Sequence, residues 1–269
     1  MQTPPVAVLS DIHGNRWALQ AVLNDISRRG IRDMVNLGDC LYGPLDPGGT
    51  AQILMELNIP TVRGNEDRII LDEPGQHKLS VYPDGPNLSV PFRGQHPDSP
   101  SLPFVQANLK PEHRQWLKTL PFTTSAFEDF FLCHGTPEKD NVYLLREVLA
   151  TGCRLLPTAA VAHQLQTISQ PIILCGHDHL PALLLLPDGR HVINPGSVGL
   201  PAYRDHLPFP HAMEAGSAHA RYSIVTRLRS GLEVEDVAVP YDWQSAAAAA
   251  TKNGRPDWAE CLGSGRAAS

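Results

Sequence analysis

The chain has 269 residues, 42% of them hydrophobic, which is enough for one sizeable domain with a buried core. Its net charge is -6 at neutral pH and its Lys and Arg residues are scattered, so we expect no binding of long nucleic acid. Neither a run of about 18 apolar residues nor a basic-then-apolar N-terminus is present, so we expect neither membrane insertion nor classical secretion.

Five segments share one design, in which a short apolar run is followed by Gly together with Asp, His or Asn. Runs of this length without polar alternation suit strands that are buried on both faces. They occupy residues 6–10, 34–37, 60–63, 130–133 and 171–175. The carboxyl ends of such strands meet at one crevice. We therefore expect the polar residues that follow them to lie together, namely Asp11, His13, Asp39, Asn65, His134, His177 and His179.

The last of these segments ends in Gly176-His177-Asp178-His179. Strand alternation would send both imidazole rings to the same side, where they would be poor core material. Taken singly, each segment has an ordinary interpretation as a helix N-cap, a buried histidine or a turn. Taken together, the five indicate a metal site. Carboxylates and imidazoles without thiolates suit Mn, Fe, Zn or Ni.

The other elements alternate between helices and hairpins. Apolar spacing predicts helices at residues 16–29, 49–58, 112–120, 138–150 and 158–169. Hairpins are expected between 182–186 and 191–193, and between 222–225 and 232–239.

Two stretches are expected to lie outside the packed core of a domain spanning residues 1–243. Residues 74–111 are rich in proline and should form a loop, which either covers the predicted site or runs over the surface. The histidines in and beside it, at 77, 96 and 113, are expected to face solvent. Residues 244–269 contain a run of five alanines and resemble a low-complexity tail, with a frayed helix and a disordered end.

The five strand-end blocks resemble the signature blocks of the calcineurin-like metallophosphoesterases. The matching residues are Asp11-x-His13, Gly38-Asp39, Gly64-Asn65, His134 and Gly176-His177-x-His179. Residues 10–15 and 194–199 are also similar to the smaller prokaryotic phosphodiesterase branch. The resemblance covers roughly residues 5 to 242 and is weak between about 72 and 115.

The resemblance implies an α/β fold, a four-layer αββα sandwich of two mixed β-sheets flanked by helices. It also implies two transition-metal ions, with Mn or Fe favoured. Asp39 would bridge them, and Asp39, Asn65 and His134 would be catalytic. Two such ions, about 3.5–4 Å apart, can share a bridging hydroxide that attacks phosphorus in line. Asp11, His13 and His179 would hold the first ion, and Asn65, His134 and His177 the second.

Position 66 departs from the family pattern. Many members have a histidine after the Gly-Asn pair that donates to the substrate, whereas this chain has Glu66. With two divalent ions, the carboxylates of Asp11 and Asp39 and one hydroxide leave a single positive charge, which a diester monoanion would neutralise. We therefore expect a phosphodiesterase in which Glu66 affects the reaction. In two alternatives, Glu66 points away and pairs with Arg63 or Arg68, or it ligates a metal itself.

Further residues are candidates for contact with a small phosphoester substrate. Arg204 would hold a phosphate oxygen and Tyr203 would stack on a base, and Tyr42 lies close to Asp39 in sequence; each would otherwise only contact solvent. Other functions left open are a phosphomonoesterase, a protein phosphatase and a noncatalytic scaffold of the same fold. The odd number of cysteines, without metal-binding spacing, favours the cytoplasm. The oligomeric state is left open.

Overall fold

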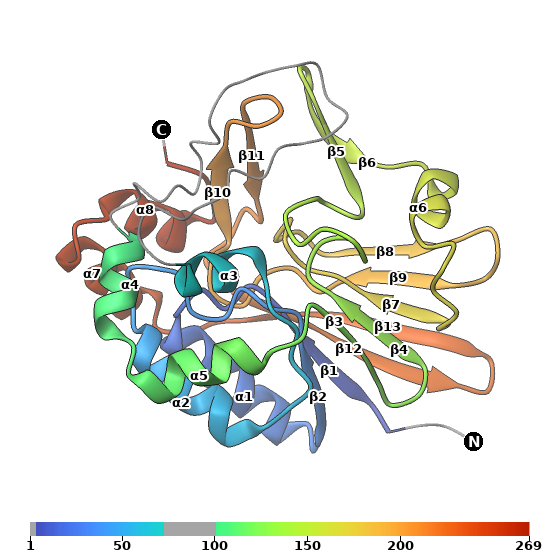
Figure 1. Ribbon diagram of the computed structural model, residues 1–269, viewed down its shortest axis with the longest axis horizontal. Coiled ribbons are helices and arrows are strands. Elements are labelled where there is room, and N and C mark those ends of the chain that lie inside the picture. The colour runs from blue at the N-terminus through green and yellow to red at the C-terminus, as the bar shows by residue number, and fades with distance from the viewer. Residues whose placement is uncertain (1–3, 73–100, 269) are drawn as a thin grey trace.

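A computed structural model describes residues 4–72 and 101–268 (Figure 1). The first of two large sheets carries two of the expected ligand-bearing strand ends. Within it, β1 pairs in parallel with β2 and antiparallel with β12. The strand order is β13 (Gly231–Val239), β12 (Ala220–Leu228), β1 (Val6–Leu9) and β2 (Asp33–Asn36). This sheet confirms the second expected hairpin.

The second sheet carries the other histidine-bearing strands. Here β4, β7 and β9 run parallel, with an antiparallel strand at each edge. The strand order is β3 (Thr123–Ala126), β4 (Phe130–Cys133), β7 (Ile172–Leu174), β9 (His191–Asn194) and β8 (Ala182–Leu185). The β8–β9 pair is the first hairpin expected from the sequence.

The two sheets pack face to face, and alternation along each strand builds three cores. Val6 and Val8 face the other sheet, whereas Ala7 and Leu9 face the helices. The core between the sheets is formed by residues of both, including Val35, Leu37, Leu132, Leu174, Ile193 and Val225. Outside the first sheet lie α1 (Arg16–Arg28) and α2 (Pro47–Leu57), and α6 (Thr158–Gln164) covers the second. The expected four-layer sandwich is confirmed.

Asp25 joins α1 to the first sheet. Its carboxylate accepts hydrogen bonds from Tyr222 (2.7 Å), Arg29 (2.8 Å) and Arg28 (3.1 Å). Partial burial acts to raise the pKa of Asp25, but these donors outweigh it and hold the pKa below its ordinary value. A lowered pKa stabilises the folded state at neutral pH, and this contribution is lost as the pH falls through the folded-state pKa.

Asp25→Asn is therefore expected to lower the free energy of unfolding by about 1–2 kcal/mol at pH 7, and by less at pH 3. Urea denaturation at both pH values measures the difference. Asp33→Asn is the control, because Asp33 has no ion pair or side-chain hydrogen bond in the described part of the chain. An equal loss at both pH values would contradict the role of the ionised carboxylate.

The end of the proline-rich stretch is helical rather than a loop, and residues 74–100 lie outside the described residues. Residues 101–108 form α4 (Ser101–Asn108), and α5 (Pro111–Thr119) follows; both pack on the core that contains α1 and α2. Pro103 is compatible with α4 because it lies in the first turn, where no intrahelical N–H bond is needed. His113 is buried rather than exposed, and its Nδ1 lies 3.4 Å from the backbone nitrogen of Lys110. Positions 77 and 96 lie outside the described residues.

Residues 138–150 do not form the expected helix. The segment is irregular up to Leu145 and continues as β5 (Arg146–Leu149), which pairs with β6 (Gly152–Leu155). Hydrogen bonds across this hairpin take the place of helical ones. Arg146 also pairs with the buried carboxylate of Asp178 at 3.1 Å, which fixes the start of the hairpin.

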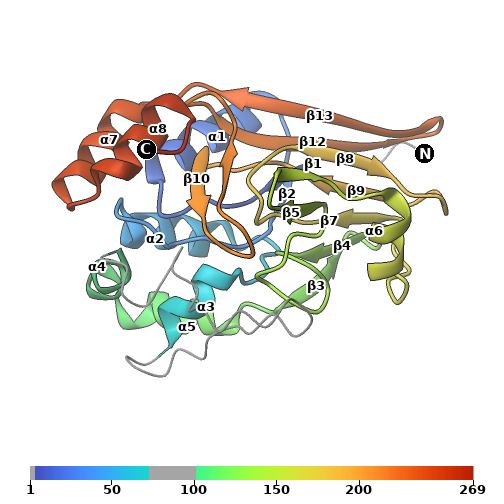
Figure 2. The same ribbon diagram turned by 90° about the horizontal axis from the view of Figure 1, so that it is seen from above.

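The C-terminal residues are folded, so the expectation of a frayed helix and a disordered end is wrong. They form α7 (Trp243–Lys252) and α8 (Pro256–Ser264), which lie beside a small hairpin of β10 (Ala202–Asp205) and β11 (His211–Glu214) (Figures 1 and 2). Small side chains let these helices pack closely. Alanine also loses no side-chain entropy on burial. Their shared core includes Ala246, Ala250, Trp258 and Leu262. No described helix is long and apolar enough to span a bilayer.

Candidate metal centre

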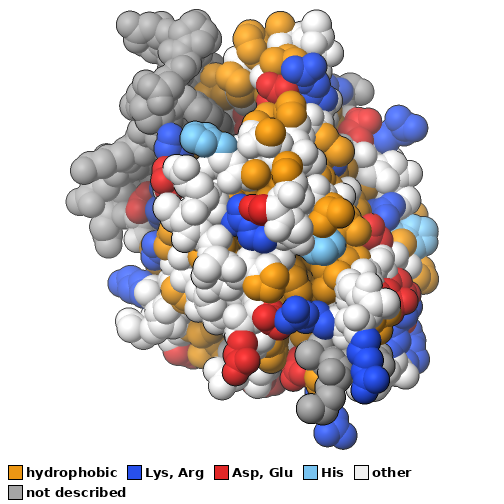
Figure 3. All heavy atoms as spheres, turned by 90° about the vertical axis from the view of Figure 1, so that its right-hand side faces the viewer, with side chains coloured by type: hydrophobic (Ala, Val, Ile, Leu, Met, Phe, Trp, Pro, Cys, Tyr) orange, Lys and Arg blue, Asp and Glu red, His pale blue; other side chains and the backbone are white. Residues whose placement is uncertain are grey.

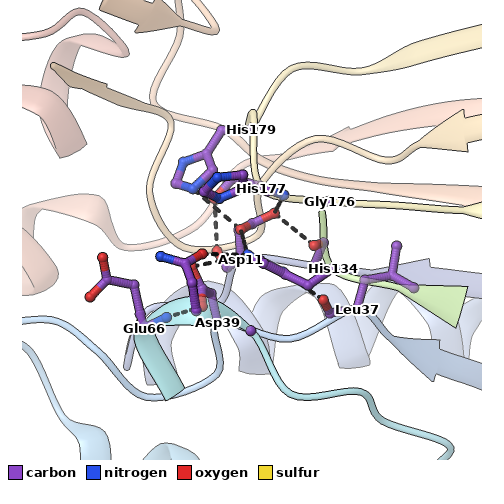
Figure 4. Close-up of polar contacts among 12 residues, drawn as sticks. Asp11, Leu37, Asp39, Glu66, His134, Gly176, His177 and His179 are labelled. Atoms are coloured by element: carbon purple, nitrogen blue, oxygen red, sulfur yellow. Dashed lines mark hydrogen bonds and ion pairs between the residues drawn. The ribbon is translucent and has the colours of Figure 1, made fainter. Parts of the chain in front are cut away.

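The loops after β1, β2, β4 and β7, with the first turn of α3 (Asn65–Leu71), bring the seven predicted ligands together (Figure 4). Six of them form two groups, and within each group the potential ligand atoms lie within 4.8 Å of one another. Asn65 joins the second group, because its Oδ1 lies 3.1 Å from His134 Nε2. The first group is Asp11, His13 and His179, and the second is Asp39, His134 and His177.

Backbone carbonyls fix the orientation of three of the imidazole rings. In each ring, Nδ1 lies within hydrogen-bond distance of a carbonyl oxygen, which can only accept. Nδ1 therefore carries the proton, and the opposite nitrogen, Nε2, points into the centre. The three contacts are His13 to Tyr42 (2.9 Å), His134 to Leu37 (2.7 Å) and His179 to Leu200 (2.7 Å).

The atoms that converge in the centre are nearly all acceptors. His13 Nε2 and His179 Nε2 lie only 3.1 Å apart, and Asp11 Oδ1 is buried without a hydrogen-bond partner in the described part of the chain. Two imidazole lone pairs at this distance repel each other unless a cation lies between them. Two nitrogens bound to one ion at about 2.0–2.1 Å would be about 3.0–3.4 Å apart. The donor set and its spacing therefore fit a transition-metal ion.

Asp39 lies where the two groups meet. Its Oδ2 is 4.0 Å from His13 Nε2 in the first group and 3.3 Å from His134 Nε2 in the second. Burial lowers the pKa of His134, but the charges of Asp39 and Asp11 outweigh it and raise that pKa to about 10. Because a ligand nitrogen must be deprotonated, metal binding would be favoured as the pH rises.

Most of these ligands have a left-handed backbone, which is uncommon for residues other than glycine and is enriched at functional sites. Asp and His tolerate this conformation better than bulky residues do. The left-handed conformation turns the chain sharply after the strand and directs the side chain inward. The φ angles are 54° at Asp11, 52° at His13, 50° at Asp39, 71° at His177 and 61° at His179. Glycine is needed at position 64 because the backbone there lies very close to Asp39. A Cβ at this position would lie 2.1 Å from Asp39 Oδ1.

Comparison with known proteins agrees with this geometry. The protein-family model of the calcineurin-like phosphoesterase superfamily domain matches residues 5–212 of this chain. The chain belongs to the calcineurin-like phosphoesterase superfamily. It is 26% identical to the uncharacterized protein MJ0912 of Methanocaldococcus jannaschii, over 94% of both chains. The crystal structure of a metallophosphoesterase from Sphaerobacter thermophilus shares the fold, with a TM-score of 0.69 and 24% identity, covering 98% of this chain and 99% of that one.

Glu66 lies to one side of this phosphoesterase centre, with its carboxylate directed away from His134 and His177 (Figure 4). It is fully buried, and neither carboxylate oxygen has a hydrogen-bond partner among the described residues. Burial and the nearby charge of Asp39 raise the pKa of Glu66 well above its ordinary value. The expected ion pair with Arg63 or Arg68 is not found in the described ranges, and Arg68 instead pairs with Asp140 at 2.8 Å. Glu66 belongs to neither ligand group.

The predicted substrate contacts differ in position. Tyr42 and Tyr203 are buried beside the centre, and the Tyr203 ring lies edge-on to His179 with centroids 4.6 Å apart. Arg204 is exposed, and its Nε donates a hydrogen bond to the Ala268 carbonyl, so the structure does not bring it to the centre.

Several supporting residues had not been singled out from the sequence. Asp67 accepts hydrogen bonds from the nitrogens of Cys40 (2.9 Å) and Gly64 (3.2 Å), which links the loop of Asp39 to that of Asn65. The Asp178 carboxylate accepts hydrogen bonds from the side chains of Arg146 and Asn194. The sequence did contain a signal for Asp178. It lies between His177 and His179, so alternation along the chain directs its side chain away from the centre. No local signal identifies Trp258, whose ring lies 5.9 Å from that of His13.

Proposed function

We propose that this phosphoesterase is dimetal-dependent and hydrolyses a small phosphodiester. The supporting observation is the pair of adjoining clusters, in which imidazole nitrogens and carboxylate oxygens converge and Asp11 Oδ1 is buried without a hydrogen-bond partner among the described residues. Asp11, His13 and His179 would hold one ion, and Asn65, His134 and His177 the other, with Asp39 shared.

When bound, two such ions would supply an activated water and neutralise charge on the phosphate. The protein chain itself holds the ligand side chains in position. Carbonyl contacts hold the three rings, and Asp39 Oδ1 accepts the Glu66 N–H at 2.9 Å, which orients its other oxygen toward both groups. Such preorganisation is the main requirement of phosphoryl transfer, because the reaction depends on positioning and charge stabilisation.

The preference for a diester rests on the charge around position 66. Glu66 supplies no cation, and its carboxylate lies to the side, so the side chain at position 66 adds no positive charge to that of the two proposed ions. A monoester dianion would leave excess negative charge, whereas a diester monoanion would balance it. On the face shown in Figure 3, Lys and Arg side chains are dispersed among acidic ones, so this face has no basic tract of the kind that binds long nucleic acid.

Comparing turnover of bis-aryl and mono-aryl phosphates with Mn²⁺ tests this proposal. We expect the diester to react faster. Glu66→His should raise the monoester-to-diester rate ratio about tenfold or more, because it restores a cationic donor. Glu66→Gln is the matched control, since it adds no cation and should change the ratio less. Faster monoester cleavage by the unaltered protein would contradict the preference, and hydrolysis of neither ester would contradict the activity.

A further inference from the structure

His177 is held differently from the other three histidines of the metal centre. Each of those has a ring nitrogen bonded to a backbone carbonyl. Within the described parts of the chain, no ring nitrogen of His177 has such a hydrogen bond. Its backbone is also left-handed, with φ at 71°, as it is at four other ligands. Something else must therefore fix the ring and the peptide of His177.

Two tyrosines from separate segments occupy the space beside His177. The Tyr143 ring lies against the His177 ring, with centroids 4.8 Å apart and planes inclined by 44°. The Tyr203 hydroxyl donates to the His177 carbonyl oxygen at 3.1 Å. On the other side of the residue, the His177 N–H donates to Asp11 Oδ2 at 3.2 Å. The ring is thus packed on one face, and both of its backbone polar groups have partners.

The two tyrosines are themselves fixed by a chain of hydrogen bonds. Their hydroxyl oxygens are 2.7 Å apart, and the Tyr143 hydroxyl also lies 3.1 Å from His211 Nε2. Because Tyr203 donates its hydrogen to His177, the single hydroxyl hydrogen of Tyr143 serves one of these two contacts at a time. His211 Nδ1 donates to the Phe209 carbonyl at 2.8 Å, which anchors the chain in the β10–β11 hairpin. Tyr203 and His211 are both buried, so water competes little for these bonds.

We infer that Tyr143 and Tyr203 are positioning residues for His177. They replace the carbonyl contact that fixes each of the other imidazoles, and they hold a strained residue in the conformation in which its ring points at the second metal site. This inference rests on the proposed dimetal function. It assigns the Tyr203 hydroxyl and the Tyr143 ring to the Asp39–His134–His177 site. It predicts that the other site, which the Tyr203 ring contacts through His179, does not depend on either of these groups.

Calorimetric titration of metal-free protein with Mn²⁺ tests the inference without any measurement of hydrolysis. Tyr203→Phe removes the hydrogen bond to the His177 carbonyl, and Tyr143→Leu removes the ring contact. Each is expected to weaken one of two binding steps about tenfold or more, as supporting residues of metal ligands do, and to leave the other within twofold. Tyr143→Phe keeps the ring and should have the smaller effect of the two changes at that position.

Tyr222→Phe is the matched control. It also removes a buried tyrosine hydroxyl, bonded to Asp25 at 2.7 Å, but it lies away from the centre and should leave both binding steps unchanged. Two unchanged steps in both Tyr203→Phe and Tyr143→Leu would overturn the inference. If the unaltered protein binds two ions but hydrolyses no phosphoester, the proposed function fails, while one weakened step in Tyr203→Phe would still support the positioning role.

Discussion

Replacement of Asp39 by alanine is expected to abolish metal-dependent phosphoester hydrolysis, with a loss of about a thousandfold or more in kcat. Asp39 is the carboxylate that lies between the two ligand groups, at 4.0 Å from His13 Nε2 and 3.3 Å from His134 Nε2. Its removal would take a shared ligand and a negative charge from both predicted sites at once. Elemental analysis of the purified variant should show fewer than two bound transition-metal ions.

Asp39→Asn separates this effect from damage to the fold. The Asp39 Oδ1 atom accepts the Glu66 N–H, and an alanine would leave that buried donor unpaired at a cost of about 1–3 kcal/mol. Asparagine can keep the acceptor while it removes the charge. Circular dichroism should therefore show a folded Asp39→Asn protein that has lost activity. Retained activity with a full metal complement would show that the bridging assignment is wrong.

A single added methyl group at Gly199 is expected to disrupt the first half of the centre. A Cβ at this position would lie 1.7 Å from the Ile12 carbonyl oxygen and 2.5 Å from its carbon. Both are backbone atoms of the turn between Asp11 and His13, so no rotamer change relieves the clash. Gly199→Ala should lower the free energy of unfolding by more than about 4 kcal/mol, a loss reserved for severe disruption of packing or backbone.

Chemical denaturation and metal content together test the prediction for Gly199. Gly30→Ala is the control, because Gly30 also follows a secondary-structure element but has nothing within 4 Å of its Cβ position. Its φ of 70° should limit the cost there to about 1–2 kcal/mol. If the two variants were equally stable, Gly199 would not be required for close contact with the ligand turn.

The candidate metal centre could be predicted from the sequence because most of the ligands follow a buried strand. The strand expected at residues 60–63, before Asn65, is not formed, and Thr61 makes only an isolated bridge with Asn36. Parallel pairing of β1 with β2, and of β4 with β7, places the ends of these strands at one edge. Local pattern and topology therefore agree, and convergence could be predicted without knowledge of side-chain positions. The cysteines beside these ligands, Cys40, Cys133 and Cys175, also pack as small core residues, which alternation along an extended chain predicts.

The residues that the sequence did not reveal are held by contacts between distant segments. Tyr143 reaches His177 from an irregular stretch that had been expected to be helical, and Trp258 reaches His13 from a helix that had been expected to be disordered. Alanine-rich composition suggested little core, but Ala246 and Ala250 are fully buried where α7 packs. Composition does not report such packing, because it depends on the neighbour rather than on the residue itself.

The position of β1 has a consequence for the order in which the molecule forms. β1 lies between β2 and β12, so its central place in the first sheet is complete only when residues 220–228 have been synthesised. Asp11 and His13 leave the ribosome well before their partner His179. We expect the centre to be assembled only after residues 220–228 have emerged, because pairing between such distant segments is slow. Until then a nascent chain would expose two ligands without their partners.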